Sequence, residues 1–320
     1  MLYLSISWHL VVFITFTTVT SLRYECPEPE DVFPCYCEEE DNDPTIYCNH
    51  FHQPQQIYNA VKGLKGHRIY KMSFFMNWIL DEVKTDAFKD IAVDRILFEN
   101  STISLTSPQF AGMENHLVGI QMRACFNKTN PMGTWSLGHL TKLTELTMDK
   151  NRILTLPDEW LTSAPDSLKT LSLEGNSIVT LEDNVFAKAK SVVFLILDDN
   201  RLTELKRSMF PKPALTLRSL SLNNNRLRYL TSDIFHDMPN LRIIEVINNR
   251  FTTLEEKVWS DMWSQLTKLD FADNPLECYR SMKWMYSDGR SKPIILYGEC
   301  QEPEKLKGKS LKALQITDFN

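Results

Sequence analysis

Apolar and polar positions follow one pattern along most of this chain, and the pattern returns every 24 to 26 residues. In most copies, apolar residues stand five and three places before an asparagine, and another stands two places after it. Around Asn200, for example, they are Leu195, Leu197 and Leu202. The asparagines of this column are Asn77, Asn151, Asn176, Asn200, Asn225, Asn249 and Asn274. Self-similarity at a fixed period predicts a repeat architecture.

The first apolar position of the pattern defines nine copies. It falls at Ile69, Val93, Leu117, Leu143, Leu168, Val192, Leu217, Leu241 and Leu266. An aromatic column follows at Phe88, Phe110, Trp160, Phe186, Phe210, Phe235 and Trp259. The spacing matches L-x-x-L-x-L-x-x-N-x-L, so the chain is identified as a leucine-rich repeat protein.

The pattern predicts an α/β-type leucine-rich repeat solenoid, or horseshoe, with a parallel β-sheet on its concave face. The convex side should be irregular or carry short helices, packed by the aromatic column. Each turn is too apolar to stand alone, so neighbouring turns share one core. The asparagine side chain is expected to point inward and to satisfy backbone groups at the bend after each strand.

The ends of the chain carry different signals. An apolar run from Leu10 to Phe16 with small residues at Val19 and Ser21 predicts a signal peptide over residues 1–21. No later stretch is apolar and long enough to span a membrane. We therefore expect a secreted, extracellular protein without a membrane span.

Cysteines cluster on both sides of the repeats and resemble the cysteine-rich caps of extracellular leucine-rich repeat proteins. We expect an N-terminal cap over residues 22–68, nine repeats over 69–276 and a shortened C-terminal cap over 277–320. Spacing alone allows three pairings of the first four cysteines. The resemblance implies the bridges Cys26–Cys37, Cys35–Cys48 and Cys278–Cys300.

Two features narrow this resemblance: the long spacing between the first two cysteines of the N-terminal cap, and the shortened C-terminal cap. They are similar to an arthropod group named after the non-catalytic subunit of oplophorus-luciferin 2-monooxygenase. In that complex the leucine-rich subunit accompanies a smaller catalytic chain. The resemblance implies an accessory role beside such a chain and carries over no site residue.

The sequence supports specific predictions for three further residues. Cys125 stands in the asparagine column, which favours a buried structural thiol over a reactive or intermolecular one. Asn100 and Asn127 begin the two N-glycosylation sequons. Asn127 falls where the repeat requires an inward apolar residue, so glycosylation of Asn127 requires a local bulge in the third repeat.

Two clusters mark the predicted concave surface as the candidate partner-binding site. One cluster is acidic and comprises Asp149, Glu174, Asp198 and Asp199. It could attract a basic ligand or a calcium ion, or it could serve only to keep the sheet soluble. The other is apolar, is expected to face solvent, and comprises Val193, Phe194, Ile196, Ile243 and Ile247. Exposed apolar patches usually mark contact with a partner.

No catalytic, metal or cofactor motif is recognisable. His50 and His52 beside Cys48 hint at metal spacing, but a surface pair in the cap explains them. The net charge of −6 argues against nucleic acid as the main partner. Two functions remain: a secreted recognition protein that binds an extracellular protein or glycan, and a non-catalytic accessory subunit of a partner enzyme.

Overall fold

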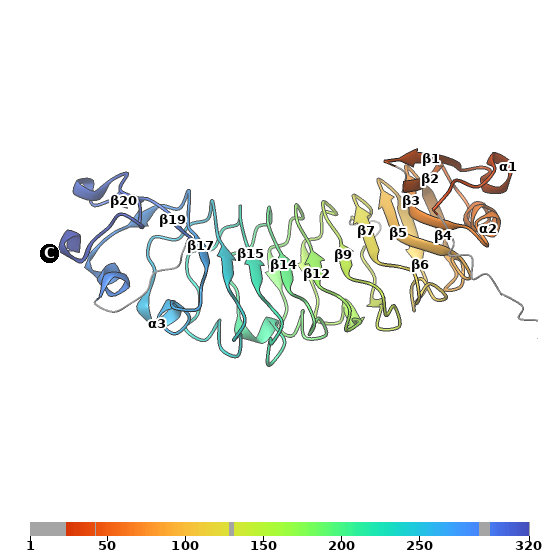
Figure 1. Cartoon of the computed structure of the whole chain (residues 1–320). Coiled ribbons are helices and arrows are strands. Elements are labelled where there is room, and N and C mark those ends of the chain that lie inside the picture. The colour runs from red at the N-terminus through yellow and green to blue at the C-terminus, as the bar shows by residue number, and fades with distance from the viewer. Residues whose placement is uncertain (1–23, 42, 128–130, 288–294, 320) are drawn as a thin grey trace, which may run out of the picture.

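The computed structural model describes residues 24–41, 43–127, 131–287 and 295–319. The predicted signal peptide lies outside these residues. The described turns stack side by side into an elongated, gently curved solenoid with β1 and β20 at opposite ends (Figure 1). The horseshoe architecture predicted from the repeat is therefore confirmed.

One twelve-stranded sheet runs along the described chain. Its first strand, β1 (Tyr36–Glu40), is antiparallel to β2, and all later neighbours are parallel. The parallel strands are β2 (Asp43–Asn49), β3 (Arg68–Phe75), β5 (Ala92–Glu99), β7 (Gly119–Arg123), β9 (Glu145–Thr147), β12 (Thr170–Ser172), β14 (Phe194–Ile196), β15 (Ser219–Ser221), β16 (Ile243–Glu245), β17 (Lys268–Asp270) and β19 (Ile295–Tyr297). The sheet thus extends past the nine predicted repeats at both ends.

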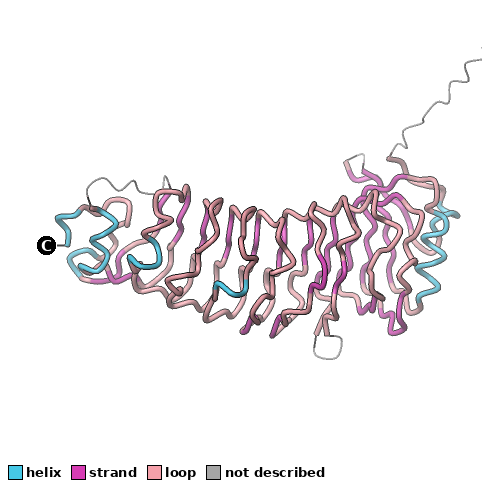
Figure 2. The backbone as a smooth tube through the Cα atoms, turned by 90° about the horizontal axis from the view of Figure 1, so that it is seen from below, coloured by secondary structure: helices cyan, strands magenta, loops and turns pink. Residues whose placement is uncertain are grey.

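Loops make up most of each turn, and the helices gather chiefly at the two ends (Figure 2). The helices are α1 (Pro29–Val32), α2 (Pro54–Gly63), α3 (Glu256–Trp259), η1 (Arg207–Met209), η2 (Arg280–Tyr286), η3 (Glu304–Leu306) and η4 (Ile316–Phe319). Short strands also pair between turns: β4 (Trp78–Val83) with β6 (Thr102–Leu105), β8 (Trp135–Ser136) with β11 (Leu161–Ser163), β10 (Thr155–Leu156) with β13 (Thr180–Leu181), and β18 (Leu276–Glu277) with β20 (Cys300–Glu302).

The asparagine column forms a buried ladder between turns. The Asn200 amide donates to the carbonyls of Leu173 and Leu197 at 2.9 and 3.1 Å, and its oxygen accepts from the Ile178 N–H at 3.0 Å. The same three kinds of hydrogen bond recur on each of the next three turns, at Asn225, Asn249 and Asn274. Each asparagine therefore satisfies backbone groups of two adjacent turns, as the sequence predicts.

The residue before each asparagine lies in the left-handed backbone region. Its φ is 57° at Lys150, 55° at Asp199 and Asn224, 52° at Asn248 and 58° at Asp273. Short Asp and Asn side chains tolerate this region better than other non-glycine residues. The conformation explains why Asp and Asn are frequent in this column.

The aromatic column packs the side opposite the sheet. Phe88, Phe110, Trp160, Phe186, Phe210 and Trp259 are buried, and Phe235 is half-buried. Neighbouring members contact each other: the ring centroids of Phe88 and Phe110 are 5.4 Å apart, and those of Phe186 and Phe210 are 5.9 Å apart. Stacked rings thus continue the core from turn to turn.

Disulfides close both ends with the pairings that the resemblance implies. Cys26 pairs with Cys37, Cys35 with Cys48, and Cys278 with Cys300. In the C-terminal cap, the buried Trp284 indole donates to the Leu254 carbonyl at 2.9 Å and packs on Trp263. The cap therefore covers the apolar end of the last turn.

The third repeat differs from the expected register. Phe126 takes the inward place after the asparagine-column residue Cys125, and Asn127 is exposed. The 26-residue spacing of this repeat accommodates the extra residues. Asn100, at a φ of 48°, is also exposed.

Candidate functional site

The outward side chains of the sheet strands form the concave surface, and strand register places them in rows. One row runs from Glu145 through Thr170, Phe194 and Ser219 to Ile243. The next runs through Thr147, Ser172, Ile196 and Ser221 to Glu245. The leucine or isoleucine between the two rows on each strand is buried in the core.

The predicted apolar cluster lies on β14 and β16, and β15 separates its two halves. Phe194 is 45% exposed. Val193, Ile196, Ile243 and Ile247 are half-buried, so Phe194 is the most exposed of the five residues that the sequence pattern turns toward solvent. The small residues Ser219 and Ser221 of β15 stand between the halves. We call Phe194, Ile196, Ile243 and Ile247 the apolar strip.

The predicted acidic ladder divides into bonded and open members. Asp149 is buried, and its Oδ1 accepts from the Ser172 hydroxyl at 2.7 Å and from the Glu174 N–H at 2.8 Å. Asp198 makes the same contacts with Ser221 and the Asn223 N–H, each at 2.7 Å. These two carboxylates brace neighbouring strand ends. Asp149 is thus not on the open surface where the sequence pattern places it.

Burial has the largest effect on the pKa values of these acids. It raises the pKa of Asp149 and Asp198, while the serine and backbone hydrogen bonds act in the opposite direction. The pKa of the half-buried Glu174 is also raised, first by burial and then by the neighbouring Asp149 and Asp199 charges. Within the described residues, no group of three or more His, Cys, Asp or Glu side chains could hold a metal ion.

Ion pairs flank the apolar strip on both sides. Toward the N-terminal end, the Arg95 guanidinium reaches over Gly119 to Glu145 at 2.7 Å, and Gln121 donates to the same carboxylate. A Cβ at Gly119 would lie 2.8 Å from Arg95 Nη1, so a larger residue there would displace the guanidinium from this position. Toward the C-terminal end, the Lys268 ammonium pairs with Glu245 and lies 3.7 Å from Asp270. The charges beside the strip are therefore largely paired within the surface.

Sequence reasoning missed two concave residues on β19. Ile295 and Tyr297 are 39% and 53% exposed and lie in register with Lys268 and Asp270 of β17. The alternation of outward Ile295, inward Leu296 and outward Tyr297 is the signal that would have identified them. They extend the concave surface into the C-terminal cap.

The remaining predicted residues lie away from this surface. His50 and His52 are exposed and stack on the Trp78 ring at centroid distances of 6.2 and 6.0 Å. The buried Cys125 thiol lies 3.3 Å from the carbonyl oxygens of Phe98 and Arg123, and burial raises its pKa to about 11. This arrangement is that of an inert structural thiol.

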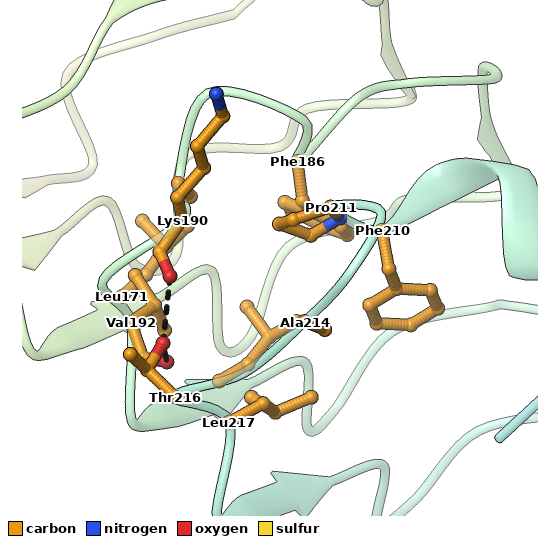
Figure 3. Close-up of a pocket in the computed structure, with 11 residues that line it drawn as sticks. Leu171, Phe186, Lys190, Val192, Phe210, Pro211, Ala214, Thr216 and Leu217 are labelled. Atoms are coloured by element: carbon orange, nitrogen blue, oxygen red, sulfur yellow. Dashed lines mark hydrogen bonds between the residues drawn. The ribbon is translucent and has the colours of Figure 1, made fainter. Parts of the chain in front are cut away.

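A small apolar cavity lies between two central turns, and Figure 3 shows its lining. Its volume of about 20 Å³ is enough for one water-sized probe. The Thr216 hydroxyl in its wall donates to the Lys190 or Val192 carbonyl, and the Lys190 ammonium points away. The cavity is a packing gap between turns and not a ligand site.

Comparison with known proteins agrees with the architecture. Residues 141–202 and 216–276 match the family described as Leucine rich repeat. No curated protein matches the sequence. No described helix has the length and apolar character needed to cross a membrane.

Solved structures with a similar fold include chains of two complexes. A chain of the TLR13-ssRNA13 complex is 21% identical with a TM-score of 0.60, and the alignment covers 70% of this chain. This protein spans only 31% of the length of that chain. A chain of the octameric complex of Latrophilin 3 (Lec, Olf), Unc5D (Ig, Ig2, TSP1) and FLRT2 (LRR) is 18% identical with a TM-score of 0.55. That alignment covers 86% of this chain and 88% of the other.

Proposed function

We propose that this chain is a secreted, non-catalytic recognition protein that binds a protein partner on its concave surface, with the apolar strip at the centre of contact. The observation that carries the proposal is the exposed Phe194 ring in the middle of the sheet. An apolar centre with a polar, charge-paired rim is the usual anatomy of a protein–protein interface.

Two further observations support partner binding and an extracellular location. Chains with a similar fold occur in complexes, one with single-stranded RNA and one with Latrophilin 3 and Unc5D. Three disulfides are typical of proteins from oxidising compartments. In that setting the exposed Asn100 and Asn127 are available to glycosylation, which a mass shift after glycosidase treatment would reveal.

The resemblance of the caps to the oplophorus-luciferin 2-monooxygenase non-catalytic subunit gives a more specific version of the proposal. In that version the partner is a small catalytic chain, and this protein stabilises it. Stoichiometric co-purification of such a chain would support the accessory role. Recovery of a receptor, matrix or microbial ligand would support general recognition.

The test combines partner capture with a double substitution. Phe194→Ala with Ile196→Ala removes the centre of the apolar strip and leaves the buried Leu195 in place. Truncation at an interface centre costs about 2 kcal/mol or more, so affinity for the captured partner should fall about thirtyfold. Tyr229→Ala, an exposed aromatic outside the sheet strands, should bind normally. Equal binding by the double variant and the wild type would refute the proposal.

A further inference from the structure

A second surface lies at the loops that follow the sheet strands, outside the concave face. On three consecutive turns the residue after the ladder asparagine is an arginine, and we call Arg201, Arg226 and Arg250 the arginine ladder. They line a groove of about 460 Å³ together with Asn176, Ser177, Asp199, Asn200, Asn224, Asn225, Asn248 and Asn249. Every side chain in this lining is polar.

The solenoid holds the arginine ladder in fixed register. The Arg201 N–H donates to the Ile178 carbonyl at 2.9 Å, Arg226 to Leu202 at 2.9 Å and Arg250 to Leu227 at 2.8 Å. Successive arginines therefore rise by one strand spacing, about 4.8 Å. The buried asparagine ladder fixes the preceding residue of each turn. The main-chain positions of the three arginines are consequently held by hydrogen bonds between turns.

The charge of the arginine ladder is not neutralised within the described part of the chain. All three side chains are exposed, and none makes an ion pair or side-chain hydrogen bond there. Arg95, Arg123 and Lys268 of the concave surface, by contrast, are paired with carboxylates. Asp199 is the single acid in the groove lining. A protein of net charge −6 thus presents a local row of unpaired guanidinium groups.

We propose that the arginine ladder binds a linear sulfated glycan, at a site separate from the proposed partner-binding surface. Guanidinium groups recognise oxyanions through paired N–H donors. The neighbouring amides of Asn224 and Asn248 bond each other at 2.9 Å, which leaves the Asn224 N–H donors and the Asn248 oxygen to face the hydroxyl groups of a sugar chain.

The lining disfavours other polyanions. Single-stranded nucleic acid requires aromatic faces on which bases stack, and this groove has none. A peptide ligand requires apolar anchor pockets, which a wholly polar lining does not provide.

Size-defined heparin oligosaccharides provide the test probe. The wild type should bind them with an affinity that falls as salt rises, because the contact is between exposed charges. Arg226→Gln should weaken binding about tenfold, the loss expected for one charge-assisted hydrogen-bonding group. The triple variant with glutamine at all three positions should abolish measurable binding. The substituted side chains are exposed, so thermal unfolding should be unchanged.

Two substitutions make the test specific. Arg152 follows Asn151 in the same column but is separated from the ladder by Ser177, so Arg152→Gln should bind heparin as the wild type does. Asp199→Asn removes the one acid and preserves a residue type that tolerates the local backbone, so heparin should bind several-fold more tightly. Equal losses from Arg152→Gln and Arg226→Gln would show diffuse charge attraction and overturn the proposal.

The remaining outcomes are also decisive. Absence of heparin binding by the wild type at low salt, or tighter binding of poly-uridine RNA or poly-glutamate than of heparin, would contradict a glycan site. The Phe194→Ala, Ile196→Ala variant should keep full heparin affinity. That result separates failure of the glycan site from failure of the proposed concave interface.

Discussion

Single side chains with two-sided hydrogen bonding hold adjacent turns of this protein together. Each ladder asparagine both donates and accepts, so it satisfies a strand-end carbonyl and an N–H of the preceding turn. Where the sequence lacks asparagine, smaller groups take over: the Ser101 hydroxyl donates to Phe74 or Glu99, and the Cys125 thiol faces Phe98. The column tolerates these replacements because each still donates toward a strand-end carbonyl.

Asn200→Ala tests this role directly. The substitution leaves the Ile178 N–H without its acceptor, whereas the Leu173 and Leu197 carbonyls keep hydrogen bonds from Asn176 and Asn225. We expect the free energy of unfolding to fall by about 1–3 kcal/mol, the cost of stranding a buried polar group. Chemical denaturation measures it, with the exposed neighbour Arg201→Ala as control. A loss no larger than that of the control would contradict the ladder's role.

The raised pKa of Asp149 predicts a pH dependence of stability. A carboxyl whose pKa is higher in the folded than in the unfolded state favours folding when protonated. Its contribution is greatest below the unfolded pKa of about 3.9 and is lost as pH rises toward and through the folded value. Asp149→Asn should therefore gain stability relative to the wild type as the pH rises above about 4. A difference that does not change with pH would refute the prediction.

At the scale of elements, short strands depend on their neighbours. A three-residue strand such as β14 buries one residue, Leu195, and gains order only through β12 and β15. The terminal strands have a neighbour on one side of the sheet only and rely on the caps. Cys278–Cys300 ties β18 to β20 beside the last sheet strand, β19.

Removal of this bridge should loosen one end of the solenoid. The double substitution Cys278→Ser, Cys300→Ser opens a loop with a sequence separation of 22 residues. A bridge of this loop length contributes about 3 kcal/mol in the chain-entropy model. Amide hydrogen exchange should accelerate in β19 and η2 and stay slow in β9 and β12. Uniform acceleration along the whole sheet would show that the turns unfold as one unit instead.

At the scale of the molecule, the solenoid separates two surfaces with different chemistry. The concave sheet carries an apolar strip between paired charges, and the loop edge carries the unpaired arginine ladder. Both surfaces lie on the same turns, and the buried ladder asparagine of each turn stands between them in the sequence.

The two surfaces should differ in their response to salt. Affinity for the concave-face partner should change by less than about threefold when salt is raised into the physiological range, because screening acts weakly on an apolar contact. Binding titrations at several salt concentrations measure this. A steep loss of partner affinity with salt would place the contact on charged residues and contradict the apolar strip as its centre.

Much of this protein follows from its sequence because a repeat converts local pattern into global shape. The period fixed the stack of parallel strands, the inward asparagines and the burial of Leu195, since each position meets the same neighbours in every turn. The same repetition placed Phe194 on the open face and made the cysteine clusters recognisable as caps.

Tertiary structure decided what the period does not encode. Asp149 is buried because a serine one strand away, Ser172, offers its hydroxyl, and such lateral contacts depend on turn-to-turn register. Phe126 replaces Asn127 in the core because the third turn carries extra residues. Ile295 reaches the concave face because the C-terminal cap returns a strand to the sheet beyond the last repeat. Contacts between turns, and departures from the period, are properties of the folded stack and not of any one copy of the pattern.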